Sequence, residues 1–268
     1  MYKISVYTCI INHYDYLFSP KVLPKGIKFY CFTDQVDHSL KSKGWILLPL
    51  SSPKSISKPN LINRYHKFFP HIVLPETDYS LYIDGNIRVI SDITPLLKEF
   101  INSTATLGLC KHPHRNTIRE EIDACINRNK ISDPELLYKE YDYYLSQGFE
   151  DIIGLTENNV ILRKHNDEMK RVMEDWWGQL NNYSQRDQIS LPYVRWKIGV
   201  KTKVFNFNAR LENPYFWLYP HTKNSLFKTI NIIVKSLKRD NIKVKVFLNY
   251  IVKPLYKRTI YPLLNKRY

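Results

Sequence analysis

The sequence predicts an α/β protein with one large domain followed by a basic tail. Runs rich in β-branched and aromatic residues recur along the chain and are separated by segments with helical periodicity, as in a sheet flanked by helices. The chain has 268 residues, 44% of them hydrophobic, and only 8 glycines, so it can bury a substantial core. The length also allows two small domains. We favour one domain over residues 1–224 and a tail over residues 225–268.

The expected elements follow from composition and periodicity. Strand composition marks residues 3–10, 27–32, 45–50, 79–83, 105–109 and 160–162. Helical periodicity marks residues 95–102, 118–128, 134–145 and 167–179, and a further helix begins near residue 183. Asp133 is placed to cap the helix that starts at Pro134. The apolar stripe of the helix at 167–179 is expected to face the core, and its members are Met169, Val172, Met173, Trp176 and Trp177.

The stretch from residue 60 to residue 90 carries the densest chemical signal. A helix starting at Pro59 places a set of polar residues at helical spacing, so that Arg64 and Lys67 point the same way. That set comprises Asn60, Asn63, Arg64, Lys67 and His71. The strand at 79–83 then ends abruptly in an acidic turn, at the place where open α/β sheets bind ligands.

The turn itself is Asp84-Gly85-Asn86. Asp84 and Asn86 offer two hard oxygen ligands for Mg²⁺ or Mn²⁺ carrying a diphosphate, and Gly85 lets the backbone bend tightly. Arg64 and Lys67 add positive charge for the same diphosphate. The alternative is an ordinary Asp-Gly turn after a strand.

Polar residues also follow the other expected strands. Thr8 and Tyr14 are placed where a nucleotide base could stack or bond. Asp34 could hold a base or ribose, or could act as a turn residue. In the loop of residues 111–115, the candidate contacts with a substrate, in our assignment a second substrate or acceptor, are His112, His114 and Arg115; the alternative is a solvated basic loop.

Two later segments complete the candidate site. Glu157 and Asn158 stand directly before the expected strand at 160–162, and we assign them to catalysis and to the acceptor, respectively. In the segment 183–188, Asp187 and Gln188 could face the sugar, with a carboxylate near the reacting carbon. The alternative is that Ser184, Asp187 and Gln188 cap the next helix.

The N-terminus and the cysteines indicate the cellular compartment in which the protein is expected. The first residues read as a strand and not as a signal peptide, and no apolar run reaches the roughly 18 residues needed to cross a bilayer. The four cysteines are widely separated, which favours buried cytosolic thiols over a disulfide framework. We therefore expect a cytoplasmic protein, either soluble or peripheral on the inner face of the membrane.

The tail holds most of the excess charge. The net charge is +15, and residues 225–268 contain 11 Lys and Arg against the single acid Asp240. A cationic amphipathic helix there could lie on an anionic membrane surface. The alternative is a helix packed on the protein's own core. The apolar stripe is Leu226, Ile230, Ile233 and Leu237, opposite Lys228, Lys235 and Arg239.

The sequence can be compared with three classes of function: nucleic-acid binding, nucleotidyl transfer and glycan binding without catalysis. A nucleic-acid-binding protein would fit the charge, but the basic excess is confined to an apolar-striped tail, so we expect no nucleic-acid partner. A nucleotidyltransferase would carry a Gly-rich N-terminal loop, which the segment VYTCIINHYD does not have. A glycan-binding relative without catalysis stays open because Asn86 stands where a second carboxylate could.

Seven blocks occur in order along the chain: VYTCIINHYD, CFTD, RYHKFFPH, YSLYIDGNI, KHPHR, ENNVILRKH, and WW followed by SQRDQIS. Together they resemble the glycosyltransferase-like family of plant mucilage and pollen-tube proteins and their bacterial relatives. The resemblance covers roughly residues 2–200.

The resemblance implies a GT-A fold and transfer of a sugar from a nucleotide-diphosphate donor, with UDP-sugars as our expectation, to a glycan or lipid-linked acceptor. It implies Mn²⁺ or Mg²⁺ at Asp84 and Asn86, although relatives often carry Lys at the position of Asn86. Asp187 with Gln188 resembles the D-Q element of retaining enzymes. GT-A enzymes commonly take one more metal ligand from a late His, here His221, and Lys223 is close enough to reach a phosphate.

Overall fold

The computed structural model describes residues 2–35, 44–131, 133–219 and 221. Contacts along the chain divide it into a compact unit of residues 1–218 and a second unit of residues 219–268. The fold described below is that of the first unit. The predicted tail helix, with its apolar stripe and basic face, lies outside the described residues.

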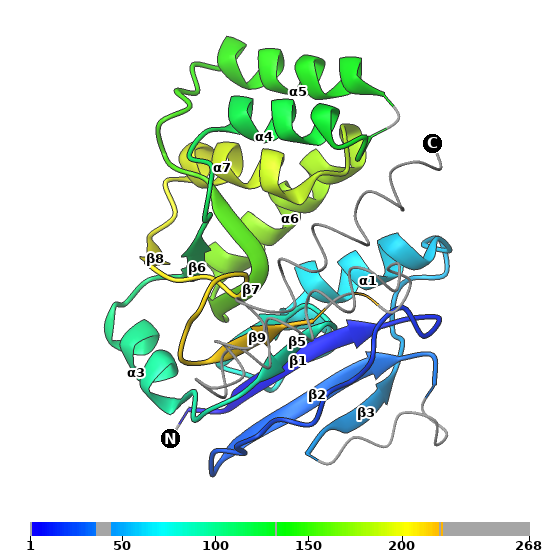
Figure 1. The fold of residues 1–268 in the computed structure, drawn as a ribbon, viewed down its shortest axis with the longest axis vertical. Coiled ribbons are helices and arrows are strands. Elements are labelled where there is room, and N and C mark those ends of the chain that lie inside the picture. The colour runs from blue at the N-terminus through cyan, green and yellow to red at the C-terminus, as the bar shows by residue number, and fades with distance from the viewer. Residues whose placement is uncertain (1, 36–43, 132, 220, 222–268) are drawn as a thin grey trace, which may run out of the picture. The chain divides into compact units, whose positions relative to one another are not determined.

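A seven-stranded sheet organises the first unit, with the strand order β3-β2-β1-β4-β7-β6-β8 (Figure 1). Every neighbouring pair is parallel except the two pairs made by β7, which runs against β4 and β6. A two-stranded antiparallel ribbon joins β5 to β9. The strands are β1 (Ile4–Ile10), β2 (Ile27–Thr33), β3 (Ile46–Pro49), β4 (Tyr79–Ile83), β5 (Ile87–Val89), β6 (Leu107–Lys111), β7 (Thr156–Lys164), β8 (Thr202–Phe205) and β9 (Phe216–Leu218).

Each face of the sheet buries its own apolar core. Because side chains alternate along a strand, Tyr82 of β4 packs into one core while its neighbours Leu81 and Ile83 pack into the other. The first core also contains residues of α1 and α4–α7, and the second contains α3 and the β5–β9 ribbon. The helices are α1 (Pro59–Phe68), α2 (Pro70–Val73), α3 (Thr94–Asn102), α4 (Ile118–Asn127), α5 (Pro134–Ser146), α6 (Asp167–Asn182) and α7 (Asp187–Ile198).

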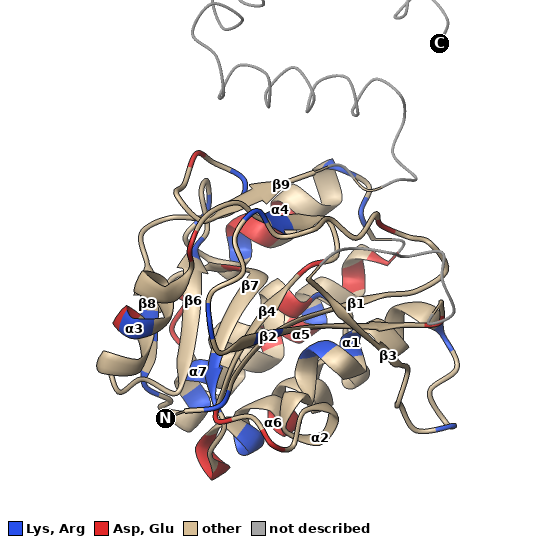
Figure 2. Cartoon of the chain, turned by 90° about the horizontal axis from the view of Figure 1, so that it is seen from below, with Lys and Arg blue, Asp and Glu red and all other residues tan. Residues whose placement is uncertain are grey.

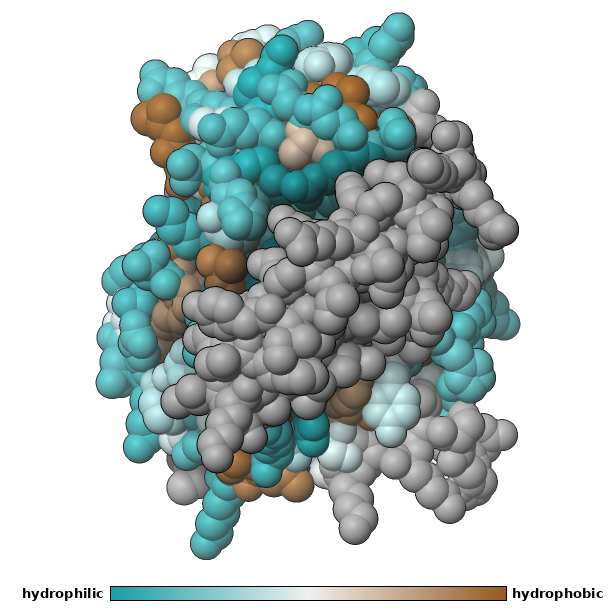
Figure 3. All heavy atoms as spheres, viewed as in Figure 1, coloured by the Kyte–Doolittle hydropathy of each residue, from teal (hydrophilic) through white to brown (hydrophobic). Residues whose placement is uncertain are grey.

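The prediction of an α/β fold with a mainly parallel sheet flanked by helices is confirmed. Asp133 caps α5 as expected, accepting a hydrogen bond from the Leu136 backbone N–H at 3.3 Å. All four cysteines are buried and unpaired. None of the helices in the described residues is long and apolar enough to span a bilayer. The surface over α4 and α5 that Figure 3 shows is mostly hydrophilic, with single apolar side chains.

Three local predictions are wrong. The first two concern predicted elements. The strand expected at 160–162 begins earlier, so Glu157 and Asn158 lie within β7 and not before it. His71 does not share the face of α1, because α1 ends at Phe68 and His71 belongs to α2. The third is the alternative given for residues 183–188, that side chains cap the next helix. No side chain caps α7: its N-cap is Arg186, while the Ser184 hydroxyl bonds to the Glu140 carboxylate.

Candidate active site

The predicted site residues of the first unit gather at one edge of the sheet. There the parallel strands β1, β2, β4 and β6 end, and the antiparallel strand β7 begins. The chain order reverses between β1 and β4, since β2 and β3 extend the sheet on one side and β4 extends it on the other. Such a switch point leaves a crevice at the carboxyl ends of the strands, where open α/β sheets bind ligands. Asp84 directly follows β4, so it lies at this edge of the sheet.

Lys67 of α1 is the centre of an ion-pair cluster. Its Nζ lies 2.7 Å from Oδ2 of Asp187 and 3.9 Å from Oδ1 of Asp84. Arg64 comes from the same helix, whose basic positions are blue in Figure 2, and its Nη1 lies 3.8 Å from Oδ2 of Asp187. The Lys67 side chain is only 7% exposed, whereas that of Asp84 is 35% exposed. A ligand in solvent can therefore reach the Asp84 carboxylate, behind which Lys67 is enclosed.

Asp187 is held as a carboxylate by this cluster. Burial acts to raise its pKa, but the positive charges of Lys67 and Arg64 outweigh burial and hold the pKa of Asp187 well below its usual range. Its position at the first turn of α7 also favours negative charge, because the backbone N–H groups point toward it. Asp187 is therefore ionised at neutral pH and is a weak base.

A buried arginine fixes the end of α1 that carries Lys67. Arg163 of β7 is fully buried, and its Nη2 donates to the backbone carbonyl of Lys67 at 2.8 Å. The Tyr7 hydroxyl donates to the same carbonyl at 3.2 Å and accepts from Nη1 of Arg163 at 3.0 Å. Within the described residues Arg163 makes no ion pair with a carboxylate. Its charge is used instead to hold the C-terminal end of α1.

Gly85 allows the turn after β4 to pack closely against the chain after β1. A Cβ atom added to Gly85 would lie 2.8 Å from Cγ1 of Ile10 and 3.1 Å from Oδ2 of Asp15. The same turn is tied to β7, because the Asp84 backbone N–H donates to the carbonyl of Asn159 at 2.9 Å. Asn86 is only 4% exposed. The packing brings Asp15, which sequence reasoning did not select, next to this turn.

The residues predicted to bind the nucleotide base or ribose are Thr8, Tyr14 and Asp34, and they differ in exposure and in hydrogen bonding. Tyr14 is 46% exposed, so its ring is accessible, whereas Thr8 is buried within β1. Both oxygens of Asp34 accept from the backbone N–H of Asn12, at 3.0 and 3.2 Å. This bond stabilises a loop in which Asn12 has a φ of 53°. Asp34 therefore stabilises this turn, as the alternative had it, and its contact with a base or ribose stays a prediction.

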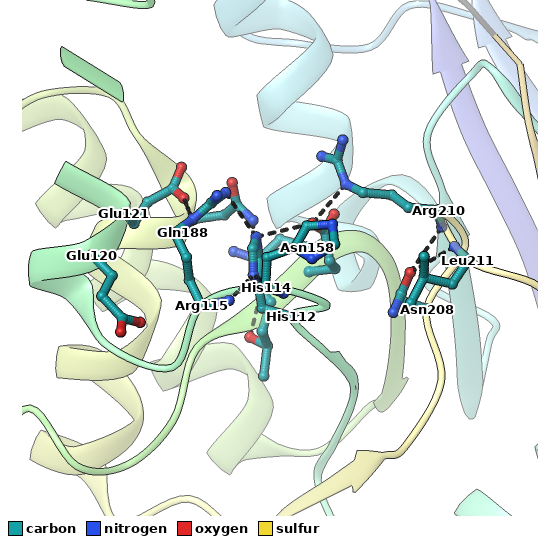
Figure 4. A network of polar contacts seen from close by, with 12 residues as sticks. His112, His114, Arg115, Glu120, Glu121, Asn158, Gln188, Asn208, Arg210 and Leu211 are labelled. Atoms are coloured by element: carbon teal, nitrogen blue, oxygen red, sulfur yellow. Dashed lines mark hydrogen bonds and ion pairs between the residues drawn. The ribbon is translucent and has the colours of Figure 1, made fainter. Parts of the chain in front are cut away.

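A buried polar network lies beside the ion-pair cluster (Figure 4). The side chain of Glu157 is 2% exposed, and its Oε1 accepts from Nε of Arg210 at 2.7 Å and lies 3.3 Å from Nε2 of His112. Burial raises the pKa of Glu157, Arg210 opposes this rise, and the nearby charge of Asp84 adds to it. Glu157 is thus enclosed by its partners in this structure, and its assignment to catalysis stays a prediction.

The loop of residues 111–115 is partly enclosed and not uniformly solvated. His112 is 3% exposed, and its Nδ1 accepts from the backbone N–H groups of His114 and Arg115. Burial lowers the pKa of His112 to about 4, so the ring is neutral at pH 7. Arg115 donates through Nε to Glu121 at 2.6 Å. The exposed member of the predicted acceptor set is His114.

The start of β7 is linked to the start of α7. The Asn158 side chain donates to the backbone carbonyl of Asp187 at 2.9 Å, and Trp176 Nε1 donates to the same carbonyl at 3.2 Å. Gln188 makes a long contact, 3.5 Å from its Nε2 to the Thr156 carbonyl. Asn158 therefore positions Asp187 relative to the sheet.

Comparison with known proteins identifies the family. The model of the TOD1/MUCI70 glycosyltransferase-like domain matches residues 53–221, more than half of the chain. The chain belongs to this family. The family resemblance found in the sequence is therefore confirmed.

Curated relatives of the TOD1/MUCI70 family are distant and longer. The chain is 25% identical over 224 residues to the probable hexosyltransferase MUCI70 of Arabidopsis thaliana, covering 74% of this chain and 38% of that protein. It is 21% identical over 249 residues to the alkaline ceramidase TOD1 of the same plant, covering 81% and 54%. The chain thus spans well under two thirds of the length of either relative.

Two solved structures of the galactosyltransferase LgtC are also similar. One is a complex with donor and acceptor sugar analogues, at 11% identity, covering 75% of this chain and 73% of that one. The other is an active-site mutant, at 14% identity, covering 77% and 73%. Both have a TM-score of 0.44, and no residue assignment follows from likeness at this level.

The carboxyl edge of this family member has the donor chemistry for a divalent cation. Mg²⁺ and Mn²⁺ prefer hard oxygen ligands, and Mg²⁺ is often held by one or two carboxylates together with substrate phosphates. Asp84 has a solvent-accessible carboxylate and Asp15 lies beside the same turn. Among the described residues, no three His, Cys, Asp or Glu side chains form a metal site by themselves. The residues therefore fit a cation that shares its ligands with a diphosphate.

Two predicted residues of this TOD1/MUCI70 member fall outside the first unit. His221 belongs to the unit of residues 219–268, and Lys223 is not among the described residues. Their assignments to the metal and to a phosphate stay predictions.

Sequence reasoning missed Asp15, Arg163 and Arg210. Arg163 occurs in the matching block ENNVILRKH, and an arginine inside an otherwise apolar strand is a signal that could have found it. Asp15 ends the matching block VYTCIINHYD, but its neighbour Gly85 is 70 positions away, so the block alone does not show that the two meet. For Arg210, the chain gives no comparable signal, because its partner Glu157 is 53 positions away.

Proposed function

We propose that this protein is a metal-dependent glycosyltransferase that moves a sugar from a nucleotide-diphosphate donor, a UDP-sugar, to a glycan or lipid-linked glycan acceptor. The observation that carries the proposal is the position of Lys67. Its ammonium lies between Asp84 and Asp187 at the switch point of the sheet. The membership of the TOD1/MUCI70 glycosyltransferase-like family supports the same reaction class.

The site is suited to a leaving diphosphate. During transfer, the bond between the anomeric carbon and the β-phosphate oxygen breaks, and negative charge develops on that oxygen. Lys67 and Arg64 are placed to stabilise this charge in a partly enclosed site. Mn²⁺ or Mg²⁺, when bound with Asp84, would supply further electrostatic stabilisation of the phosphate oxygens.

A retaining outcome fits the electrostatics of Asp187. A general base works best with a pKa near the operating pH, whereas the pKa of Asp187 is held well below its usual range. We therefore propose that the leaving phosphate oxygen accepts the proton of the acceptor hydroxyl as the new bond to the anomeric carbon forms. Asp187 then positions Lys67 and stabilises positive charge on the sugar.

A donor screen tests the proposal. Purified protein is incubated with UDP-, GDP- and CMP-sugars and Mn²⁺, and donor hydrolysis and the thermal shift are measured. We expect one class of donor to be hydrolysed and to raise the melting temperature, with both effects lost in Asp84→Ala. Asp123→Ala is the matched control, because Asp123 is an exposed carboxylate on α4 that pairs with Arg119. If no nucleotide sugar shifts the wild type, the proposal is wrong.

The relative described as an alkaline ceramidase supplies a second candidate, hydrolysis of the amide bond of a ceramide. The same preparations can be assayed for fatty-acid release from ceramide in mixed micelles. Release that depends on Asp84, without hydrolysis of any nucleotide sugar, would favour amide hydrolysis over glycosyl transfer. Binding of glycans without either reaction would indicate a relative that has lost catalysis.

Attachment to a membrane is a further part of the proposal. We propose that residues 225–268 bind an anionic membrane surface and that the protein is cytoplasmic, on the inner face of the membrane. The support is the composition of this segment, which holds 11 Lys and Arg and one Asp.

A further inference from the structure

Arg210 is an exposed arginine that a buried carboxylate holds in place. Its side chain is 46% exposed, whereas that of Glu157, 2.7 Å away, is 2% exposed. The loop that carries Arg210 is itself fixed, because Oδ1 of Asn208 accepts from the backbone N–H groups of Arg210 and Leu211, at 3.0 and 2.9 Å. Glu157 receives a second contact from His112 at 3.3 Å. The guanidinium is therefore oriented before any ligand binds.

The contact with Glu157 uses one end of the guanidinium. Arg210 donates through Nε, and in the described part of the chain its two Nη atoms have no hydrogen-bond partner. Figure 4 shows this end of Arg210 pointing out of the network. Two Nη atoms in one plane match the two oxygens of a carboxylate or a phosphate. The geometry thus leaves a planar fork for an anion.

Arg210 is also the most exposed arginine of the network. Arg115 and Arg186 both pair with the fully buried Glu121, at 2.6 and 3.4 Å, and their side chains are 12% and 23% exposed, against 46% for Arg210. The carboxylate of Glu120 acts on Arg115 as well, and His112 is neutral at pH 7. Among these three arginines, Arg210 is the one that an anion in solvent can reach.

The fork lies beside the ion-pair cluster and not within it. Glu157 is the neighbour in β7 of Asn158, whose side chain donates to the Asp187 carbonyl at 2.9 Å. The loop 111–115 adjoins the same pair, because Nε2 of His112 lies 3.3 Å from Oε1 of Glu157, and the exposed His114 is two residues farther along this loop. A molecule held by Arg210 would thus lie beside the reaction centre and near the loop that is expected to contact the acceptor.

We propose that Arg210 binds an anionic group of the acceptor substrate, either the carboxylate of a uronic acid or a phosphate. The assignment of the anion to the acceptor substrate rests on the proposed glycosyl transfer. The anion site itself rests on the fork of Arg210 above Glu157.

Direct binding tests the site without requiring turnover. The full-length protein is titrated by calorimetry with three probes: a uronic-acid trisaccharide, its uncharged methyl ester, and a sugar 1-phosphate. The variants are Arg210→Gln and, to avoid leaving Glu157 buried and unpaired, the double variant Arg210→Gln with Glu157→Gln. Arg119→Gln is the control, because Arg119 is a more exposed arginine on α4, 56% exposed. Donor hydrolysis is measured in the same preparations.

We expect the wild type and Arg119→Gln to bind at least one anionic probe, and both Arg210 variants to bind it at least about 10-fold more weakly. The probe that binds distinguishes a carboxylate from a phosphate. The inference is overturned if neither anion binds, if the double variant binds as tightly as the wild type, or if the acid binds and its methyl ester binds equally well. If the anion binds through Arg210 but no donor is hydrolysed, the proposed function fails and the anion site stands. If donor is hydrolysed but no anion binds through Arg210, the proposed function stands and the anion site fails.

Discussion

Lys67 is the side chain on which the candidate reaction depends most. It is shared by two carboxylates, of which Asp187 is the nearer at 2.7 Å and Asp84 lies at 3.9 Å. Because the Lys67 side chain is 7% exposed, the interactions of its ammonium with other charges are screened less than those of a surface lysine. A phosphate that reaches Asp84 through a cation would lie close to Lys67 as well. Lys67 therefore stabilises the carboxylate of Asp187 and also lies where its charge can act on the phosphates of a donor.

Replacing Lys67 by methionine should reduce catalysis strongly. We expect Lys67→Met to lower the rate of donor hydrolysis by about 10²- to 10³-fold, because one fixed positive charge is lost from the developing diphosphate. The rate is measured with the donor found in the screen. Lys170→Met is the matched control, since Lys170 on α6 is 48% exposed and pairs with Asp167. A Lys67→Met protein that is folded and within threefold of the wild-type rate would contradict this role.

The depressed pKa of Asp187 predicts a pH dependence of stability. Its folded pKa lies below the unfolded value of about 3.9, so the unfolded chain takes up this proton first as the pH falls. The stabilisation by Asp187 is therefore complete above about pH 5 and is lost as the pH falls below about 4 toward the folded pKa. In thermal unfolding between pH 5 and pH 2.5, Asp187→Asn should lose less stability than the wild type. Parallel curves for the two proteins would refute the assignment, and Asp123→Asn serves as the exposed control.

The elements of the sheet differ in how well the sequence could predict them. β4 was predictable because five consecutive buried residues end at an acidic turn. The start of β7 was not, since its polar residues Glu157 and Asn158 are buried by contacts with Arg210 and α7. The β5–β9 ribbon pairs Val89 with Phe216, far apart in the chain, and short segments of this kind carry little periodic signal. The edge that forms the candidate site could be anticipated, whereas its long-range partners could not.

The turn between β4 and β5 provides a test with an internal control. Gly85→Ala would place a Cβ atom 2.8 Å from Ile10, so we expect it to lower the free energy of unfolding by about 1–3 kcal/mol. A Cβ atom on Gly178, inside α6, would meet nothing within 4 Å. Gly178→Ala should therefore stabilise the protein by about 0.5–1 kcal/mol, because alanine favours a helix. Urea denaturation measures both changes. Equal effects of the two substitutions would show that Gly85 is not required by close packing.

The positive charge is distributed unevenly over the whole chain. The net charge is +15, and residues 225–268 contribute 11 Lys and Arg and one Asp. In the compact unit of residues 1–218, by contrast, several basic groups are committed to carboxylates, as Lys67 is to Asp187 and Arg115 to Glu121. The excess positive charge is thus concentrated in the region with the predicted apolar stripe. Such a combination favours an anionic surface over a nucleic acid as the partner.

Removal of the tail should abolish membrane binding without unfolding the domain. We expect the full chain to sediment with vesicles that contain phosphatidylserine, each basic residue contributing about 1 kcal/mol near the surface, and to dissociate as salt screens this attraction. A chain ending at residue 224 should remain in the supernatant, with its helix content checked by circular dichroism. Vesicles of phosphatidylcholine alone are the control for charge. Serine substitutions at Leu226, Ile230, Ile233 and Leu237 keep every charge, so a further loss of binding in that variant would show that the apolar stripe inserts. Unchanged sedimentation of the truncated chain would mean that the tail does not attach the protein to the membrane.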